Sequence, residues 1–436
     1  MTWQLYDTWV VITGALCAMA CALPGAQLVL RRRSMMGDAI SHVVLPGVAI
    51  AFLVTASNDP YVMLVGAVII GVLTTLLIDL VQRAGKTEVG ASMGIVFTAL
   101  FALGLVLIRK AADDVHIDPH VVIYGSIELS YLDQVRLLGW EVPRGAVVNG
   151  AALLANGVLF LLFHKELKIT AFDESLAASM GFRPRLVQGV LMAMTAATAV
   201  AAFETVGSIL VVAMIIIPGA AAWLLTDRYG HMLLWTLLIA ALSALLGHVA
   251  ALIVPGWIGF EGMSTSGSMA VMAGVLFVVA WACAPQHGLI VRFRRRVLLS
   301  RRIAMEDILG LLYRYEEEAK QDAAALTVAD VREALSVSHV MAALALRGVR
   351  GAKQVQFQTG GVHLTEDGRV AAQSLVRTHR LWERFLWERL GLRADHIHDT
   401  ADRLEHFTSE EMAQELAQLD DAGEDPHGRP IPPAGE

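Results

Sequence analysis

Few cysteines and few charged residues occur in this sequence, and each shortage excludes a class of protein. The 436 residues include only three cysteines, which lie in apolar segments and form no Cys-x-x-Cys pair. Neither a disulfide framework nor a thiolate zinc site is therefore indicated. Charged residues make up 17% of the chain and its net charge is −7, which is too modest to indicate a nucleic-acid-binding protein from bulk electrostatics.

A nucleotide-binding loop is also missing. Gly85-Lys86-Thr87 looks like the end of a phosphate-binding loop, but Leu80 stands where that motif requires its first glycine. We therefore expect no enzymatic activity from this chain. If ATP drives its action, another polypeptide hydrolyses the ATP.

Long apolar runs are abundant up to about Cys283, whereas charged residues become dense from Arg292 onward. Each run has the length of roughly 17–25 residues that a helix needs to cross a bilayer. The runs lie at about 9–30, 40–56, 61–81, 90–108, 147–163, 185–202, 206–225, 232–253 and 266–284. We predict an all-α polytopic membrane domain of about eight or nine transmembrane helices in residues 1–290, then a basic linker in 291–304 and a soluble tail.

Basic short loops follow every second apolar run. These loops are Arg31–Arg33, Arg83–Lys86, His164–Lys168, Asp227–His231 and Arg292–Arg302. Because positively charged loops stay on the cytoplasmic side, the pattern predicts a multi-pass protein of the bacterial inner membrane with a cytoplasmic tail. Pro24, Pro46 and Pro218 lie inside the runs and are expected to bend or break their helices.

Ionisable residues inside the apolar runs are candidates for a transport path, because a charge in a bilayer is costly. Asp38 and His42 stand one helical turn apart and could bind a cation together; alternatively they cap the start of a span. His248 lies deep in the eighth run, where a hydrogen-bonded packing histidine is the other interpretation.

The stretch Phe172–Gly181 lies between two runs on the predicted cytoplasmic side and has the pattern of a short amphipathic helix. It includes Phe172, Asp173 and Glu174 and ends at Gly181. Asp173 suits the N-cap or first turn of such a helix. Taken alone, the stretch could be a simple connector.

Potential metal ligands gather in the tail on two helical stripes. His379 and Glu383 are spaced i and i+4, and His398, Asp402, Glu405 and His406 are spaced i, i+4, i+7 and i+8. Each set therefore lies on one helix face. Facing each other, the six groups could hold one or two divalent transition ions. The alternative interpretation is that these side chains are ordinary charged groups on solvent-exposed helix faces.

The membrane half resembles the permease subunits of ABC-type manganese, zinc and iron importers, the ABC-3 family. The resemblance is carried by Gly37–Gly47, Gly94–Phe97, Phe172–Gly181, Val206–Gly219 and Ala284–Gly288. It implies a homodimeric or heterodimeric helical channel, driven by a cytoplasmic ATPase and supplied by an extracytoplasmic metal-binding protein. It also assigns Phe172–Gly181 to coupling with the ATPase and makes Asp38 and His42 contacts for the travelling ion.

The tail resembles metal-dependent repressors of the diphtheria-toxin-repressor family, including their manganese-responsive branch. The matching segments are Met305–Asp307, Leu364–Gly368, His379–Glu383, His398–His406 and Asp425–Pro432. The resemblance implies an α+β winged-helix domain in residues 305–370 and helices for metal binding and dimerisation in 371–436.

Carried over by position, Asp307, Asp402, Glu405 and His406 form the core of one metal site, and His379, Glu383 and His398 complete it or build a second. Iron regulators place sulfur ligands where this chain has Asp307 and Asp402. The oxygen ligands favour Mn²⁺, then Fe²⁺ or Zn²⁺, with no organic cofactor. Gly310 stands at a further ligand position of the manganese regulators, so the binding of a second ion stays an open question.

The segment that would read DNA, Ser336–Leu346, is mostly apolar and offers few groups to base edges. We therefore do not expect nucleic acid as a partner. The leading hypothesis is a metal importer permease whose cytoplasmic metal-sensing tail feeds back on transport. The alternatives are a membrane-tethered metal-dependent transcriptional regulator and an ATP-independent secondary carrier.

Overall fold

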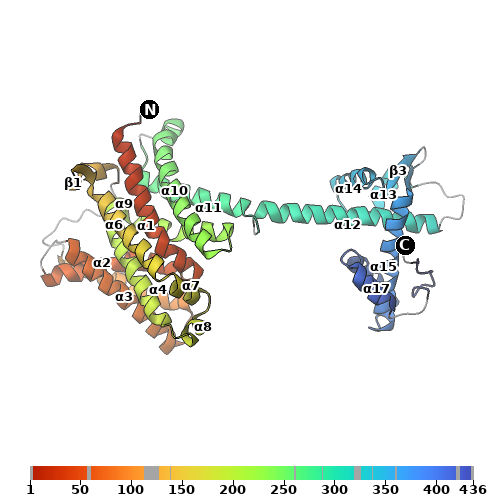
Figure 1. Cartoon of the computed structure of the whole chain (residues 1–436), viewed down its shortest axis with the longest axis horizontal. Coiled ribbons are helices and arrows are strands. Elements are labelled where there is room, and N and C mark those ends of the chain that lie inside the picture. Colours follow the sequence, from red (N-terminus) through yellow and green to blue (C-terminus); the bar gives the residue numbers. More distant parts are fainter. Residues whose placement is uncertain are drawn as a thin grey trace. The chain divides into compact units, whose positions relative to one another are not determined.

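The computed structural model describes residues 3–55, 60–111, 127–137, 139–259, 262–286, 288–318, 326–335, 337–358, 361–418 and 423–433. The chain divides into two compact units, Met1–Val291 and Arg292–Glu436 (Figure 1). Each unit is described by itself.

The first unit is a bundle of long apolar helices. They are α1 (Leu5–Leu30), α2 (Met35–Thr55), α3 (Pro60–Gly85), α4 (Val89–Ala111), α6 (Arg144–Leu162), α9 (Pro184–Leu225), α10 (Tyr229–Ile258) and α11 (Thr265–Cys283). Within the described residues they supply 8 stretches long and apolar enough to span a membrane, two of them from α9. This confirms the predicted multi-pass membrane fold.

Short polar elements connect these helices. One group consists of the 3₁₀ helix η1 (Ile127–Leu132) and the antiparallel hairpin of β1 (Gln134–Leu137) and β2 (Trp140–Pro143). The other consists of α7 (His164–Phe172) and α8 (Glu174–Ser179).

Helix α1 runs through the middle of the first unit and packs against α6, α9 and α10 (Figure 1). Small residues permit this close packing: Cys17, Ala18, Cys21 and Ala22 are fully buried in it. A side chain at Gly25 would place its Cβ only 1.9 Å from the carbonyl oxygen of Ile215 in α9. Membrane helices associate through such backbone approaches, because lipid provides no hydrophobic drive between them.

The break in α9 lies at a glycine, not at a proline. Gly207 has φ 76° and ψ 170°, a conformation that L side chains rarely adopt. Gly207 is the second residue of the predicted run at 206–225, which follows the run at 185–202. The structure assigns helix across Pro24, Pro46 and Pro218, so of the expected bend or break, no break occurs at these prolines. Membrane bundles tolerate such prolines when neighbouring groups satisfy the freed carbonyls.

Buried hydrogen bonds join the helices of the first unit. Gln27 Nε2 donates to Tyr229 Oη at 2.5 Å, and Asn156 Nδ2 donates to the carbonyl of Ala20 at 3.0 Å. At the end of α1, Arg31 Nη2 donates to Thr170 Oγ1 of α7 at 2.7 Å. The connector that contains α7 is therefore held directly by the central helix.

The second unit consists of a winged-helix part followed by three helices. Its elements are α12 (Leu289–Glu318), α13 (Val328–Ala334), α14 (His339–Gly351), β3 (Val355–Gln358), β4 (Gly361–Leu364), α15 (Glu366–Glu388), α16 (Ala394–Glu405) and α17 (Glu410–Gln418). Strands β3 and β4 pair antiparallel, with Val355 opposite Leu364. This confirms the predicted α+β tail. Residues 292–304, within the predicted linker, are helical and form part of α12.

The core of the winged-helix part is continuous from α12 to α15. Ile308, Val331, Val349 and Ala372 belong to one cluster of buried residues. The capping box of Thr327 with Asp330 begins α13, and the Thr365 hydroxyl accepts from the Gly368 amide to begin α15. Helices α12 and α15, which carry Asp307, His379 and Glu383, are thus fixed to one another.

We predict that Gly25→Ala destabilises the first unit, because the new methyl group would push α1 away from α9. Overpacking of this kind costs about 1–3 kcal/mol. The matched control is Gly157→Ala in α6, where an added Cβ meets no atom within 4 Å. Thermal unfolding in detergent should show a lower midpoint for Gly25→Ala than for the control. Equal midpoints would contradict the proposed close packing.

Candidate metal centre

Two helices bring the predicted tail ligands together. Helix α15 carries His379 and Glu383, and α16 carries His398, Asp402 and Glu405. His406 is the C-cap residue of α16. Apolar contacts among Leu386, Ile397 and Ala401 hold the two helices side by side.

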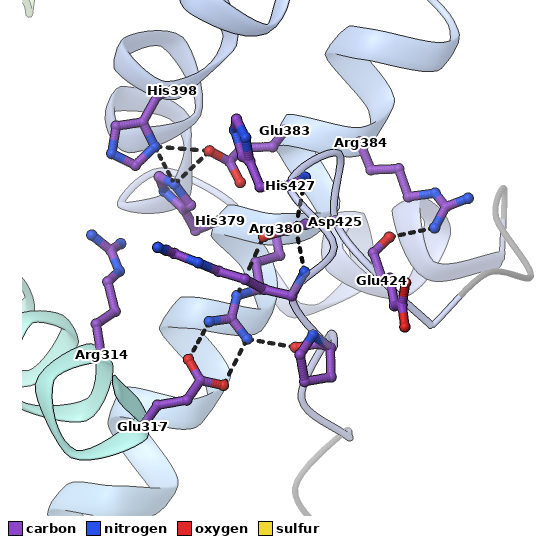
Figure 2. Close-up of polar contacts among 12 residues, drawn as sticks. Arg314, Glu317, His379, Arg380, Glu383, Arg384, His398, Glu424, Asp425 and His427 are labelled. Carbon is purple, nitrogen blue, oxygen red and sulfur yellow. Dashed lines mark hydrogen bonds and ion pairs between the residues drawn. The ribbon is translucent and has the colours of Figure 1, made fainter. Parts of the chain in front are cut away.

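The first ligand group consists of His379, Glu383 and His398 (Figure 2). The Glu383 carboxylate lies 2.8 Å from His398 Nδ1 and 3.2 Å from His379 Nε2. His379 and Glu383 are buried, whereas the His398 side chain is 57% exposed. Solvent therefore reaches this group from the His398 side.

The second ligand group consists of Asp307, Glu405 and His406. His406 Nε2 lies 3.1 Å from an Asp307 oxygen and 3.8 Å from a Glu405 oxygen. Asp307 comes from α12, so this group joins the winged-helix part to α16. A cavity of about 280 Å³ lies beside it, and polar residues such as Ser374, Glu405 and His406 share its lining with apolar ones.

Glu405 connects the two groups. Its Oε2 lies 2.5 Å from His379 Nδ1, so one carboxylate faces an imidazole from each group. His379, Asp402 and Glu405 form a third possible ligand set, in which Asp402 is exposed. The structure thus brings together all seven tail residues predicted from the sequence, in overlapping sets of three.

The acidic residues change the protonation of the neighbouring histidines. Burial lowers the pKa of His379, but hydrogen bonds to Glu383 and Glu405 outweigh burial and raise it above its ordinary value. For His406, burial is likewise outweighed by hydrogen bonds to Asp307 and Glu306, and the pKa rises to about 10. Burial also raises the pKa of Glu383, but bonds to His379 and His398 bring it down to about 2. These carboxylates therefore favour a cation among them.

Glu306 is a residue of the site that sequence reasoning missed. Its Oε2 lies 2.7 Å from His406 Nδ1, and its Oε1 accepts from Arg302 Nε at 2.8 Å. With Nδ1 bonded to Glu306, His406 directs Nε2 towards Asp307. Ligating histidines usually have such a carboxylate on their second nitrogen, which fixes the ring. The only sequence signal was that Glu306 precedes Asp307.

Gly310 contributes no side-chain ligand, and an added Cβ there would lie 3.4 Å from Leu375. A basic residue lies near the shared carboxylate instead: Arg314 Nη2 is 3.8 Å from Glu405 Oε2. The carboxylates that α12 directs towards His406 are instead those of Glu306 and Asp307, one turn earlier.

A C-terminal segment is fastened beside the ligands by arginines of α15 (Figure 2). Arg380, next to His379, is buried and bonds Glu317 of α12 and the carbonyl of Pro430. Arg384 donates to the carbonyl of Glu424. The Asp425 carboxylate accepts from the amides of His427 and Arg429 at 2.9 and 2.8 Å, which shapes the turn.

The candidate path residues of the first unit lie on two helices, α2 and α10. Asp38 and His42 belong to α2, but their side chains lie outside the described ones. His248 is buried, with Nε2 at 3.2 Å from Asp7 and Nδ1 at 3.5 Å from Thr265. Asp7 was not predicted from the sequence. Its contact agrees with the interpretation of His248 as a hydrogen-bonded histidine.

The predicted coupling stretch is exposed around α8. Phe172 is 65% exposed, and Glu174 and Gly181 are exposed as well. Asp173 is the N-cap, accepting from the amides of Ser175 and Leu176. Apart from the face around the buried Ala177, α8 is therefore not covered by the described part of the first unit.

Residues 6–284 match the ABC 3 transport family, and residues 365–433 match the metal binding and dimerisation domain of iron dependent repressors. The second match contains His379, Glu383, His398, Asp402, Glu405 and His406.

Curated relatives agree with the first match. The manganese transport system membrane protein MntD of Bacillus subtilis is 39% identical over 66% of this chain and 95% of its own length. The zinc transport system membrane protein TroD of Treponema pallidum is 37% identical over 68% of this chain and 78% of its own length.

Another relative aligns with the tail as well. The manganese transport system membrane protein MntC of Bacillus subtilis is 27% identical over 93% of this chain and 90% of its own length. From these matches and the two-unit structure, the chain belongs to the ABC 3 transport family and carries a C-terminal repressor-like metal-binding domain.

Proposed function

We propose that this chain is the membrane subunit of an ATP-driven importer of divalent transition metal, favouring Mn²⁺, and that its tail senses the same metal in the cytoplasm. The observation that carries the proposal is the pair of ligand groups joined through Glu405. A permease of a metal-transport family has little reason to hold such groups unless the tail responds to metal.

The ligand chemistry supports Mn²⁺ before Fe²⁺ or Zn²⁺. Within the described residues, the second group offers carboxylate oxygens from Asp307 and Glu405 and one imidazole from His406, with no thiolate. Oxygen-rich sites suit Mn²⁺, whereas thiolates select zinc. The relatives named above belong to manganese and zinc systems.

The proposed partners follow from the family. A cytoplasmic ATPase would contact the exposed α8, an extracytoplasmic metal-binding protein would deliver the ion, and a second permease subunit would complete the channel. Asp38 and His42 are the proposed contacts for the ion in α2. His248, paired with Asp7, remains a further candidate.

Feedback is the proposed role of the tail. An ion in the second group would tie α12 to α16, because Asp307 comes from one and His406 from the end of the other. The filled tail would then dimerise or dock and restrain inward opening of the channel. Coupling energies of about 1–3 kcal/mol are typical of such linkage and change an equilibrium severalfold.

A DNA-binding role has little support from the winged-helix part. The exposed surface of α14 includes Val340 and only two arginines, Arg347 and Arg350. Arg350 lies over the ring of Phe357 at 5.2 Å. Recognition helices need several polar groups at base edges. A secondary carrier, the other alternative, would have no use for the exposed α8.

Elemental analysis of the purified chain tests metal binding. We expect Glu405→Gln to lose the ion of the second group and to weaken the first, because Glu405 faces both His379 and His406. Glu383→Gln should lose only an ion of the first group. Glu410→Gln on α17, which belongs to neither group, should match the unaltered chain. Full metal content in Glu405→Gln would rule out the shared site.

Glu306→Gln is expected to weaken Mn²⁺ binding by about 10–100-fold, because the amide holds the His406 ring less firmly than the carboxylate does. Glu316→Gln is the control, since Glu316 also lies on α12 but pairs with Arg369. Titration calorimetry of the two variants measures the difference. Equal affinities would show that Glu306 does not orient His406.

Cells that carry Glu405→Gln should accumulate severalfold more manganese than cells with the unaltered chain, because the tail can no longer bind the metal that restrains transport. Uptake of radioactive Mn²⁺ into metal-replete cells measures the effect, with Glu410→Gln as the control. If uptake and its inhibition by metal stay unchanged although the purified variant has lost its metal, the feedback proposal fails while metal binding stands.

A further inference from the structure

The first half of α12 is strongly basic and has no acidic residue to balance it. Six arginines occur between Leu289 and Arg302, and the first carboxylate of the helix is Glu306. Arg302 pairs with that carboxylate at 2.8 Å. The other exposed arginines of this half are Arg292, Arg294, Arg295 and Arg296. No ion pair of these four is found in the described part of the chain.

An apolar stripe runs along the same half of the helix. Ile290, Phe293 and Val297 are spaced i, i+3 and i+7, so they lie on one face. Phe293 is 71% exposed and Ile290 57% exposed, whereas Val297 is partly buried. Arg294 and Arg296 flank the stripe on opposite sides by helical spacing.

The segment follows the last apolar helix of the chain almost directly. Helix α11 ends at Cys283 and α12 begins at Leu289. Between them, the Gly288 amide bonds the carbonyl of Ala284 at 3.0 Å, and a side chain at Gly288 would collide with that carbonyl. A tight connection of this length keeps the start of α12 close to the end of a membrane span.

We propose that residues Leu289–Arg302 lie in the lipid–water interface of the cytoplasmic leaflet and bind the headgroups of anionic phospholipids. The apolar stripe enters the boundary of the acyl chains, as the apolar face of an interfacial helix does. The arginines extend their apolar stems along the lipid and place their guanidinium groups at the phosphates. Each juxtamembrane arginine adds to the attraction of an anionic surface.

The apolar stripe separates this proposal from a simpler role for the arginines. Positive charge alone is sufficient to keep a loop on the cytoplasmic side, and that role needs no uncovered Phe293 between the arginines. A protein partner would also cover the stripe. Its binding, however, would not depend on lipid charge.

Fluorescence quenching in the full-length chain tests the proposal. Ser300 lies on the stripe side of the helix, so Ser300→Cys with an environment-sensitive dye reports on the face without removing Phe293. Exposed Cys283 is replaced by serine, whereas Cys17 and Cys21 are fully buried. The reference label is Val340→Cys on α14, where the native side chain is 71% exposed.

The chain is reconstituted in vesicles of phosphatidylcholine alone and of phosphatidylcholine mixed with phosphatidylglycerol. With phosphatidylglycerol, a lipid-borne quencher should act severalfold more strongly on the label at 300 than on the label at 340. Raising the salt concentration should reduce the difference. Replacement of four arginines by glutamine should also reduce the difference in quenching; these are Arg292, Arg294, Arg295 and Arg296.

Two results would overturn the proposal. Equal quenching of both labels by aqueous iodide in either lipid would place the stripe in water. Shielding of the label at 300 that is the same in both lipids and persists in detergent would assign the stripe to a protein contact. Neither result depends on transport activity, so the test is independent of the proposed import function.

Discussion

The buried carboxylate of Glu405 is the group on which the organisation of the tail depends. It faces His379 from α15 and His406 from its own helix, and Arg314 of α12 lies nearby. A buried charge is tolerated only when several partners compensate it. The three helices converge at this point, so their apolar packing must also leave this carboxylate with its partners.

The membrane unit obeys a different constraint. Its helices gain nothing from hydrophobic burial against each other, so they rely on close approach and on internal hydrogen bonds. Gly25 against Ile215 and Gln27 against Tyr229 are examples at one end of α1. The same chain thus uses small residues where the surroundings are lipid and paired charges where the surroundings are water.

Much of this structure could be predicted from the local spacing of residues, whereas contacts between residues far apart in the sequence could not. The helices and the facing ligand stripes follow from periodicity, and Asp307 came from a resemblance to known repressors. The roles of Glu306 and Asp7 were not predicted, because their partners His406 and His248 lie 100 and 241 residues away in the sequence. The break at Gly207 was not predicted for another reason. A proline in an apolar run indicates a possible break, whereas the sequence does not show which glycine adopts a positive φ.

The C-terminal segment has a consequence for how the sequence can vary. Arg377, Arg380 and Arg384 hold this segment by backbone carbonyls, those of Pro432, Pro430 and Glu424. Every residue type has a carbonyl, so most side chains of the segment can drift over evolutionary time without loosening it. Asp425 and Arg429 are exceptions, because the Asp425 side chain makes the turn and the Arg429 side chain donates to Glu318 at 3.0 Å. Selection on this stretch should therefore act on these two side chains and on the three arginines of α15.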